Sequence, residues 1–230
     1  MTHLLGAGVF LVMGMWLLYG HRDKPRYIAA MSVFIFAIIF TLSMSGVYHL
    51  LTPATTGRAV LQRLDHAGIF FLIAGTFTPV HGLLFRGLMR WGFLFLIWTI
   101  AITGITLKTI FFTDIPEWLG LIFYLGLGWM GALSGYLLFR KYGWHYLKPL
   151  VYGAIAYTVG AALDFIGHPV LISHVVGPHE IFHIAVIVGI SMHWKFLVQI
   201  VEPELGKEAV SGPSSQSRTA AGTAETYVAR

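Results

Sequence analysis

Long apolar stretches separated by short polar segments dominate the hydropathy pattern of this chain. Seven of them reach the length of about 20 mainly apolar residues that an α-helix needs to cross the hydrocarbon core of a bilayer. They lie at about residues 4–20, 27–51, 66–85, 91–112, 118–139, 149–166 and 179–201. The pattern predicts an all-α, integral membrane protein built as a bundle of seven transmembrane helices.

The amino-acid composition points the same way. Of the 230 residues, 57% are hydrophobic and only 11% are charged, whereas soluble domains carry about 25% charged residues. Lipid must therefore cover most of the surface. We expect residues 1–201 to form the transmembrane domain. Residues 202–230 are rich in Ser, Gly, Ala and Thr, and we expect them to form a disordered polar tail.

Lys and Arg are distributed unevenly between the two membrane faces. Because the number of spans is odd, the two chain ends lie on opposite membrane faces. The N-terminal face then holds only three basic residues, Arg58, Arg63 and Lys108, and the other face holds twelve. The positive-inside rule predicts that the C-terminus is cytoplasmic and that the N-terminal face lies outside. Lys108, near the end of its span, is expected to snorkel to the membrane interface.

Most histidines fall on that N-terminal face, and an ionisable group near a span end is a functional candidate. The chain has no cysteine, so a metal would need His, Asp or Glu ligands. Seven of the 11 histidines lie here: His3, His49, His66, His168, His174, His179 and His183. The same face also receives Asp65, Asp164 and Glu180. We interpret four of them, His3, His66, His168 and His174, as packed or snorkelling residues. Asp164 is expected to be an ordinary helix-end carboxylate, and Glu180 to be no ligand.

Two pairs of residues on this face have the spacing of four that places both side chains on one side of a helix. Ser45 and His49 stand at i and i+4 near the end of one span, and His179 and His183 repeat that spacing at the start of another, so each pair shares one helix face. Asp65 opens the span that follows His49. Three imidazoles and a carboxylate at one depth predict a zinc site with a position open to water. Asp65 could bind the metal or accept a proton from the water, and Ser45 could hydrogen-bond a carboxylate or a substrate carbonyl.

Glycines recur along the fifth span. Gly126, Gly128, Gly131 and Gly135 include a pair separated by three residues. That spacing in a membrane helix favours close packing against a neighbouring helix. We expect this glycine face to be a packing surface.

With these motifs the sequence resembles the hemolysin III family, the bacterial branch of the progestin and adipoQ receptor group that includes the adiponectin receptors. The resemblance covers about residues 2–201. It rests on THLLGAG at 2–8, SMSGVYHL at 43–50, RLDHAGIFFLIAGTFTP at 63–79 and GPHEIFHIAVIVGISMHW at 177–194. The family pattern of S-x3-H, Asp and H-x3-H appears in order. It implies zinc on His49, His179 and His183, Asp65 bound to the zinc or to its water, and Ser45 next to them.

The resemblance leaves three functions open. Eukaryotic relatives imply a zinc-dependent hydrolase of a lipid amide or ester, the family name implies cytolysis through a pore, and a receptor or sensor would use zinc structurally. Membrane lipids are the expected partners, because the sequence shows no phosphate loop, nucleophile elbow or nucleic-acid-binding module. The family implies a bacterial plasma membrane. The adiponectin receptors are described with the zinc layer toward the cytoplasm, opposite to the orientation that the basic residues predict here.

Overall fold

The computed structural model describes residues 2–172 and 176–210. Within them, seven spans are long and apolar enough to cross a membrane, which confirms the predicted helical bundle. α5 and α6 together form one span, from Glu117 to Tyr142, and the last span ends at Val201. The helices are α1 (Thr2–Gly20), α2 (Pro25–Leu50), α3 (Thr56–Leu84), α4 (Leu88–Ile110), α5 (Glu117–Trp129), α6 (Gly131–Tyr142), α7 (Trp144–Ile166) and α8 (Pro178–Val210).

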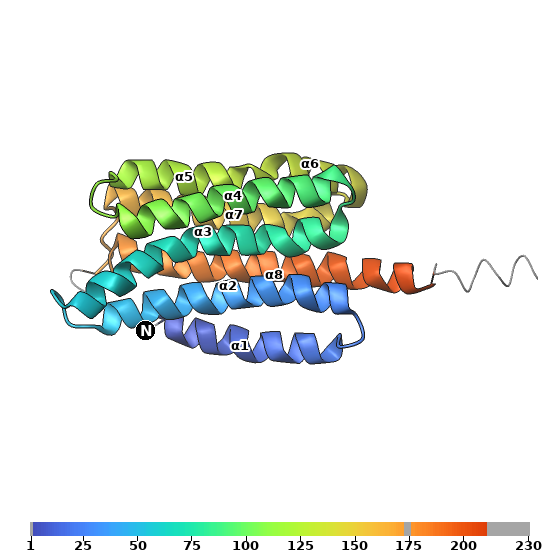
Figure 1. Ribbon diagram of the computed structural model, residues 1–230, viewed down its shortest axis with the longest axis horizontal. Helices are drawn as coiled ribbons and strands as arrows, with labels where there is room; N and C mark the ends of the chain where they lie inside the picture. The colour runs from blue at the N-terminus through green and yellow to red at the C-terminus, as the bar shows by residue number, and fades with distance from the viewer. Residues whose placement is uncertain (1, 173–175, 211–230) are drawn as a thin grey trace, which may run out of the picture.

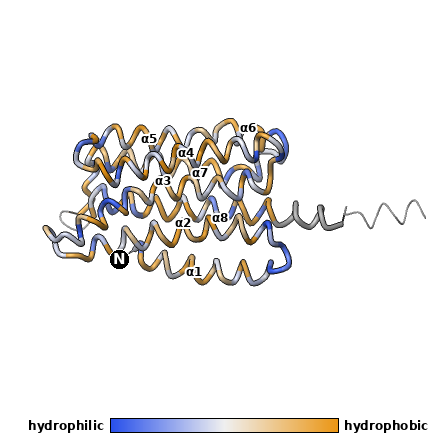
Figure 2. The backbone as a smooth tube through the Cα atoms, in the orientation of Figure 1, coloured by the Kyte–Doolittle hydropathy of each residue, from blue (hydrophilic) through white to orange (hydrophobic). Residues whose placement is uncertain are grey.

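The helices run side by side along the long axis of the molecule (Figure 1). α2 packs between α1 and α3, α3 also packs on α4, and α7 packs along α8, which reaches both α1 and α3. Polar residues gather at the two ends of the bundle, and apolar residues fill the helix lengths between them (Figure 2). Side chains such as Leu5, Trp16 and Phe95 are exposed, as lipid-facing residues must be.

Three helix boundaries differ from the sequence prediction. α3 begins at Thr56 rather than at about 66, because the Thr55 hydroxyl caps it by accepting a hydrogen bond from the Arg58 N–H (3.3 Å). Asp65 therefore lies inside α3 instead of opening it. α7 begins at Trp144, ahead of the predicted residue 149. Helices continue beyond the apolar stretch because their hydrogen bonds do not depend on lipid.

The third difference concerns the predicted polar tail. α8 continues to Val210, so residues 202–210 are helical rather than disordered. Residues 211–230 lie outside the described residues, and the prediction for them stays a prediction.

The prediction that Lys108 snorkels to the membrane interface is wrong. Only 4% of its surface is exposed, and its ammonium nitrogen lies 5.2 Å from the centre of the Phe112 ring. The absent side chain of Gly120 makes room, since a Cβ there would lie 3.0 Å from Lys108 Cε. The lysine is thus held inside the bundle.

An elongated cavity of about 870 Å³ lies within the bundle. Asp65 and His81 both line it and both belong to α3, where a rise of 1.5 Å per residue separates them by about 24 Å. We call the two ends the histidine end and the far end. The histidine end is lined by His49, Asp65, His179 and His183, and the far end by His81, Ser134, Leu147 and His193.

Candidate metal centre

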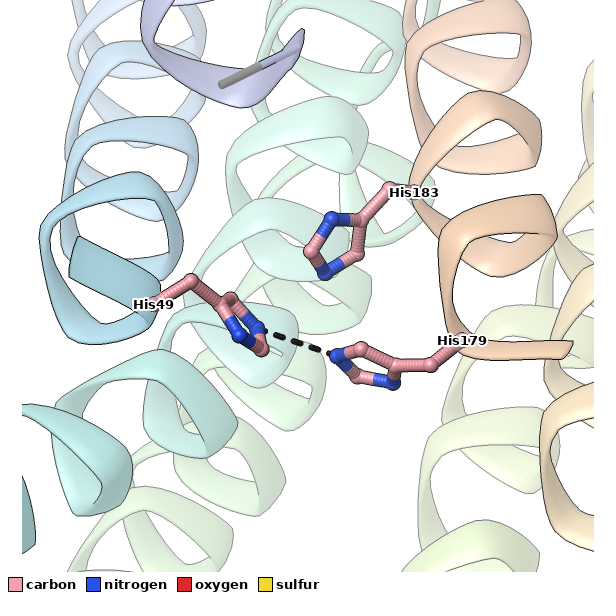
Figure 3. A group of neighbouring side chains, drawn as sticks. All are labelled: His49, His179 and His183. Carbon is pink, nitrogen blue, oxygen red and sulfur yellow. Dashed lines mark hydrogen bonds between the residues drawn. The ribbon is translucent and has the colours of Figure 1, made fainter. Parts of the chain in front are cut away.

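Three imidazoles meet at the histidine end of the cavity. His49 comes from the last turn of α2, and His179 and His183 come from the first turns of α8. One ring nitrogen of each lies within 4.8 Å of the other two, and the rings turn toward one another (Figure 3). The Nε2 atoms of His49 and His179 are 3.0 Å apart, near the roughly 3.3 Å expected for two nitrogens on one tetrahedral zinc. The three residues are therefore close enough to hold a metal ion.

The start of α8 fixes the position of two of these rings. Pro178 occupies the first helical position, where its missing N–H costs nothing. The Gly177 N–H donates to the Glu180 carboxylate at 2.8 Å, which is one half of a capping box. Glu180 thus caps the start of α8, and its interpretation as no ligand stays a prediction.

Asp164 contacts His179, which the sequence interpretation of Asp164 as an ordinary helix-end carboxylate did not predict. Its Oδ1 lies 3.1 Å from Nδ1 of His179. Nδ1 donates to this carboxylate, so Nε2 keeps its lone pair and faces His49. Metal-binding histidines characteristically donate their second ring N–H to such an acceptor. The only sequence signal for Asp164 was its place on the histidine-rich face, near the end of α7 and across a loop from His179.

His3 supports the centre from α1. Its ring stacks on His183 with 3.9 Å between centroids, and its Nε2–H donates to the His183 carbonyl oxygen at 3.1 Å. Only 3% of His3 is exposed, so it is a packed residue, as expected. The contact ties the N-terminal turn of α1 to the helix that carries two of the three imidazoles.

Asp65 and Ser45 stand beside the group. Both line the cavity, and the buried Ser45 hydroxyl interacts with the Asp65 carboxylate. Among the described residues no carboxylate joins the three histidines. Direct binding of Asp65 to a metal stays a prediction.

Of the remaining histidines of this face, His66 and His168 do not join the three-histidine group. His66 lines the cavity and packs against Phe112, with ring centroids 5.1 Å apart. His168 is exposed in the segment after α7. His174 lies outside the described residues. For His66 and His168, the interpretation as residues that bind no metal stays a prediction.

Comparison with known proteins places the chain in a family. The family model described as "Haemolysin-III related" matches residues 1–194. The chain is similar to Hemolysin-3 of Bacillus cereus, with 29% identity over 198 residues that cover 83% of this chain and 84% of the relative. It is also similar to the Hemolysin-3 homolog of Bacillus subtilis (strain 168), with 29% identity over 133 residues, 58% of this chain and 62% of the relative. This chain therefore belongs to the haemolysin-III-related family of multi-pass membrane proteins.

Proposed function

We propose that this protein is a membrane hydrolase that holds zinc on His49, His179 and His183 and cleaves an amide or ester bond of a membrane lipid. The position of the three imidazoles at one end of a long cavity inside the bundle carries the proposal. Three neutral nitrogen donors suit zinc. When bound, zinc supplies a Lewis acid and lowers the pKa of a coordinated water toward about 7.

The residues around the imidazoles have distinct roles in this proposal. Asp164 holds His179 in the tautomer whose Nε2 can bind a metal. Asp65 accepts the proton of the attacking water, and Ser45 orients the Asp65 carboxylate through their contact. Direct binding of Asp65 to zinc is the alternative role, and the metal content of an Asp65→Asn variant distinguishes the two.

The cavity defines the substrate class. Side chains such as Ile69, Leu72, Phe77 and Val186 line it, so its interior favours an alkyl chain over a polar molecule. Its volume of about 870 Å³ lies within the usual range for ligand sites. We propose that the acyl chain of the lipid lies along the cavity and that its head, with the scissile bond, lies at the histidine end.

Metal analysis combined with turnover tests the proposal. Purified protein should contain about one zinc per chain and should hydrolyse at least one member of a panel of lipid amides and esters. The His183→Ala variant should lose both properties. His145→Ala is the matched control, because His145 is exposed at the start of α7, away from the histidine end. Full zinc content in His183→Ala contradicts the proposed ligand set, and zinc without turnover on any substrate favours a sensor with a structural metal.

Cytolysis is the second candidate, and the names of the two Bacillus relatives favour it. In that case the metal would join α2 to α8 without taking part in a reaction. Release of a trapped dye from lipid vesicles measures pore formation directly. Dye release that persists in a His49→Ala variant supports the pore, whereas intact vesicles in the presence of folded protein argue against it.

We propose that the protein resides in a bacterial plasma membrane with its C-terminus in the cytoplasm. The Bacillus origin of the relatives and the twelve basic residues on the C-terminal face support this orientation. The histidine end would then face outward.

A further inference from the structure

A serine and a histidine form a hydrogen-bonded pair at the far end of the cavity. Ser134 lies on α6 and His81 near the end of α3, and the Ser134 Oγ is 2.9 Å from His81 Nε2. Only 2% of Ser134 and none of His81 is exposed, yet both line the cavity. Neither residue takes part in the proposed zinc chemistry, which is confined to the opposite end.

The direction of this hydrogen bond follows from the second nitrogen of the ring. His81 Nδ1 lies 2.6 Å from the carbonyl oxygen of Met89. A carbonyl oxygen only accepts, so Nδ1 carries the hydrogen, and in the neutral ring Nε2 presents a lone pair. The Ser134 hydroxyl therefore donates to Nε2. The imidazole is placed to take the proton of the serine.

Aromatic packing holds the imidazole in this orientation. The His81 ring stacks on Phe93, with 4.0 Å between centroids and 6° between planes, and on Phe85, with 4.7 Å and 18°. Rotation of the ring would break both stacks and the bond to Met89. A nucleophile within hydrogen-bond reach of a base, with the base oriented by a third group, is the arrangement of an activated serine.

We propose that Ser134 is a nucleophile, activated by His81, toward long-chain acyl esters that enter the cavity. The Ser134 Oγ bonds to the acyl carbonyl carbon while its proton passes to His81 Nε2. The ester C–O bond breaks, and the leaving alcohol takes that proton. Water then hydrolyses the acyl-serine, which releases the fatty acid and restores the hydroxyl. The apolar side chains of Leu138 and Leu147, which line the cavity near the pair, suit an alkyl chain.

A long-chain alkyl fluorophosphonate tests the nucleophile directly, because it phosphonylates activated serines with loss of fluoride and needs no metal. The purified full-length protein is incubated with the probe, and mass spectrometry locates the adduct. We expect one adduct per chain, on Ser134, and none in Ser134→Ala. His81→Phe keeps the aromatic stack but removes the base, and it should slow labelling at least about 100-fold.

Ser191→Ala is the matched control. Ser191 is exposed on α8 and donates to the Ile187 carbonyl oxygen at 2.7 Å, so its loss should leave labelling unchanged. Thermal melting establishes that each variant is folded. If His81→Phe does not fold, protection of wild-type Ser134 by an excess of a long-chain acyl ester replaces it. An unmodified Ser134 in folded protein overturns the proposal, as does equal labelling in His81→Phe or a lack of protection by the ester.

Discussion

Asp164 determines which nitrogen of His179 is available to a metal. Because Nδ1 donates to the carboxylate, Nε2 of the neutral ring carries the lone pair and faces Nε2 of His49 at 3.0 Å. A residue that contacts no metal itself can in this way control the affinity of the whole group.

Replacement of Asp164 by Asn should weaken metal binding about 10- to 100-fold, because the amide keeps the shape of the side chain but loses its charge. Competition with a chromophoric chelator measures the affinity. Asp114→Asn is the matched control, since Asp114 lies exposed in the connection between α4 and α5. Equal affinities for the two variants would show that the contact between Asp164 and His179 does not support the metal.

Sequence reasoning found the three imidazoles together with Asp65 and Ser45, but not the contact of Asp164 with His179 or that of Ser134 with His81. His179 and His183 are recognisable because a spacing of four residues places two side chains on one helix face. Asp164 reaches His179 across a loop, and Ser134 reaches His81 across 53 positions of the chain. No local pattern predicts such contacts, because they depend on which helices become neighbours.

At the scale of the helices, the glycines that matter for packing differ from those that the sequence indicated. No atoms lie within 4 Å of an added Cβ at Gly126, Gly128 or Gly135, whereas a Cβ at Gly131 would lie 3.0 Å from the Phe77 ring, so only Gly131 of this stretch makes the close contact that we expected. Closer contacts lie elsewhere: a Cβ at Gly75 on α3 would lie 2.6 Å from the Cβ of Ala37 on α2, and one at Gly160 on α7 would lie 2.5 Å from the Cβ of Ala185 on α8. A small-residue spacing predicts that two helices can approach, but not that they do.

Gly75→Ala should therefore destabilise the protein by about 1–3 kcal/mol, the usual cost of overpacking. The free energy of unfolding in detergent measures the change. Gly126→Ala makes the same chemical change in open space, where the better helix propensity of Ala should leave stability equal or slightly higher. If Gly75→Ala were as stable as Gly126→Ala, the contact between α2 and α3 would be looser than described.

The hydropathy pattern also failed to predict where some of the helices begin and end. Hydropathy marks the part of a helix that crosses lipid, so the seven spans were predicted correctly while the polar first turns of α3 and the extension of α8 were not. The extension of α3 carries Asp65 deeper into its helix than expected. The carboxylate still lines the cavity beside His49, because α3 returns antiparallel to α2.

At the scale of the whole molecule, the two ends of the bundle carry different kinds of side chain. One end presents imidazoles and carboxylates, and the other carries most of the Lys and Arg. A single cavity connects the layer of three histidines with the Ser134–His81 pair. Which membrane face each end occupies therefore decides from which side water and polar products can enter and leave.

The absence of native cysteine makes this orientation measurable with single reporter cysteines. Thr113 is exposed in the connection between α4 and α5, at the histidine end, and Asp23 is exposed between α1 and α2, at the opposite end. If the basic end is cytoplasmic, a membrane-impermeant maleimide should label Thr113→Cys in intact bacterial cells and Asp23→Cys only after lysis. The two variants control for each other, because each must react once the membrane is opened. The reverse pattern would place the histidine end in the cytoplasm and would show that the excess of basic residues does not set the orientation of this bundle.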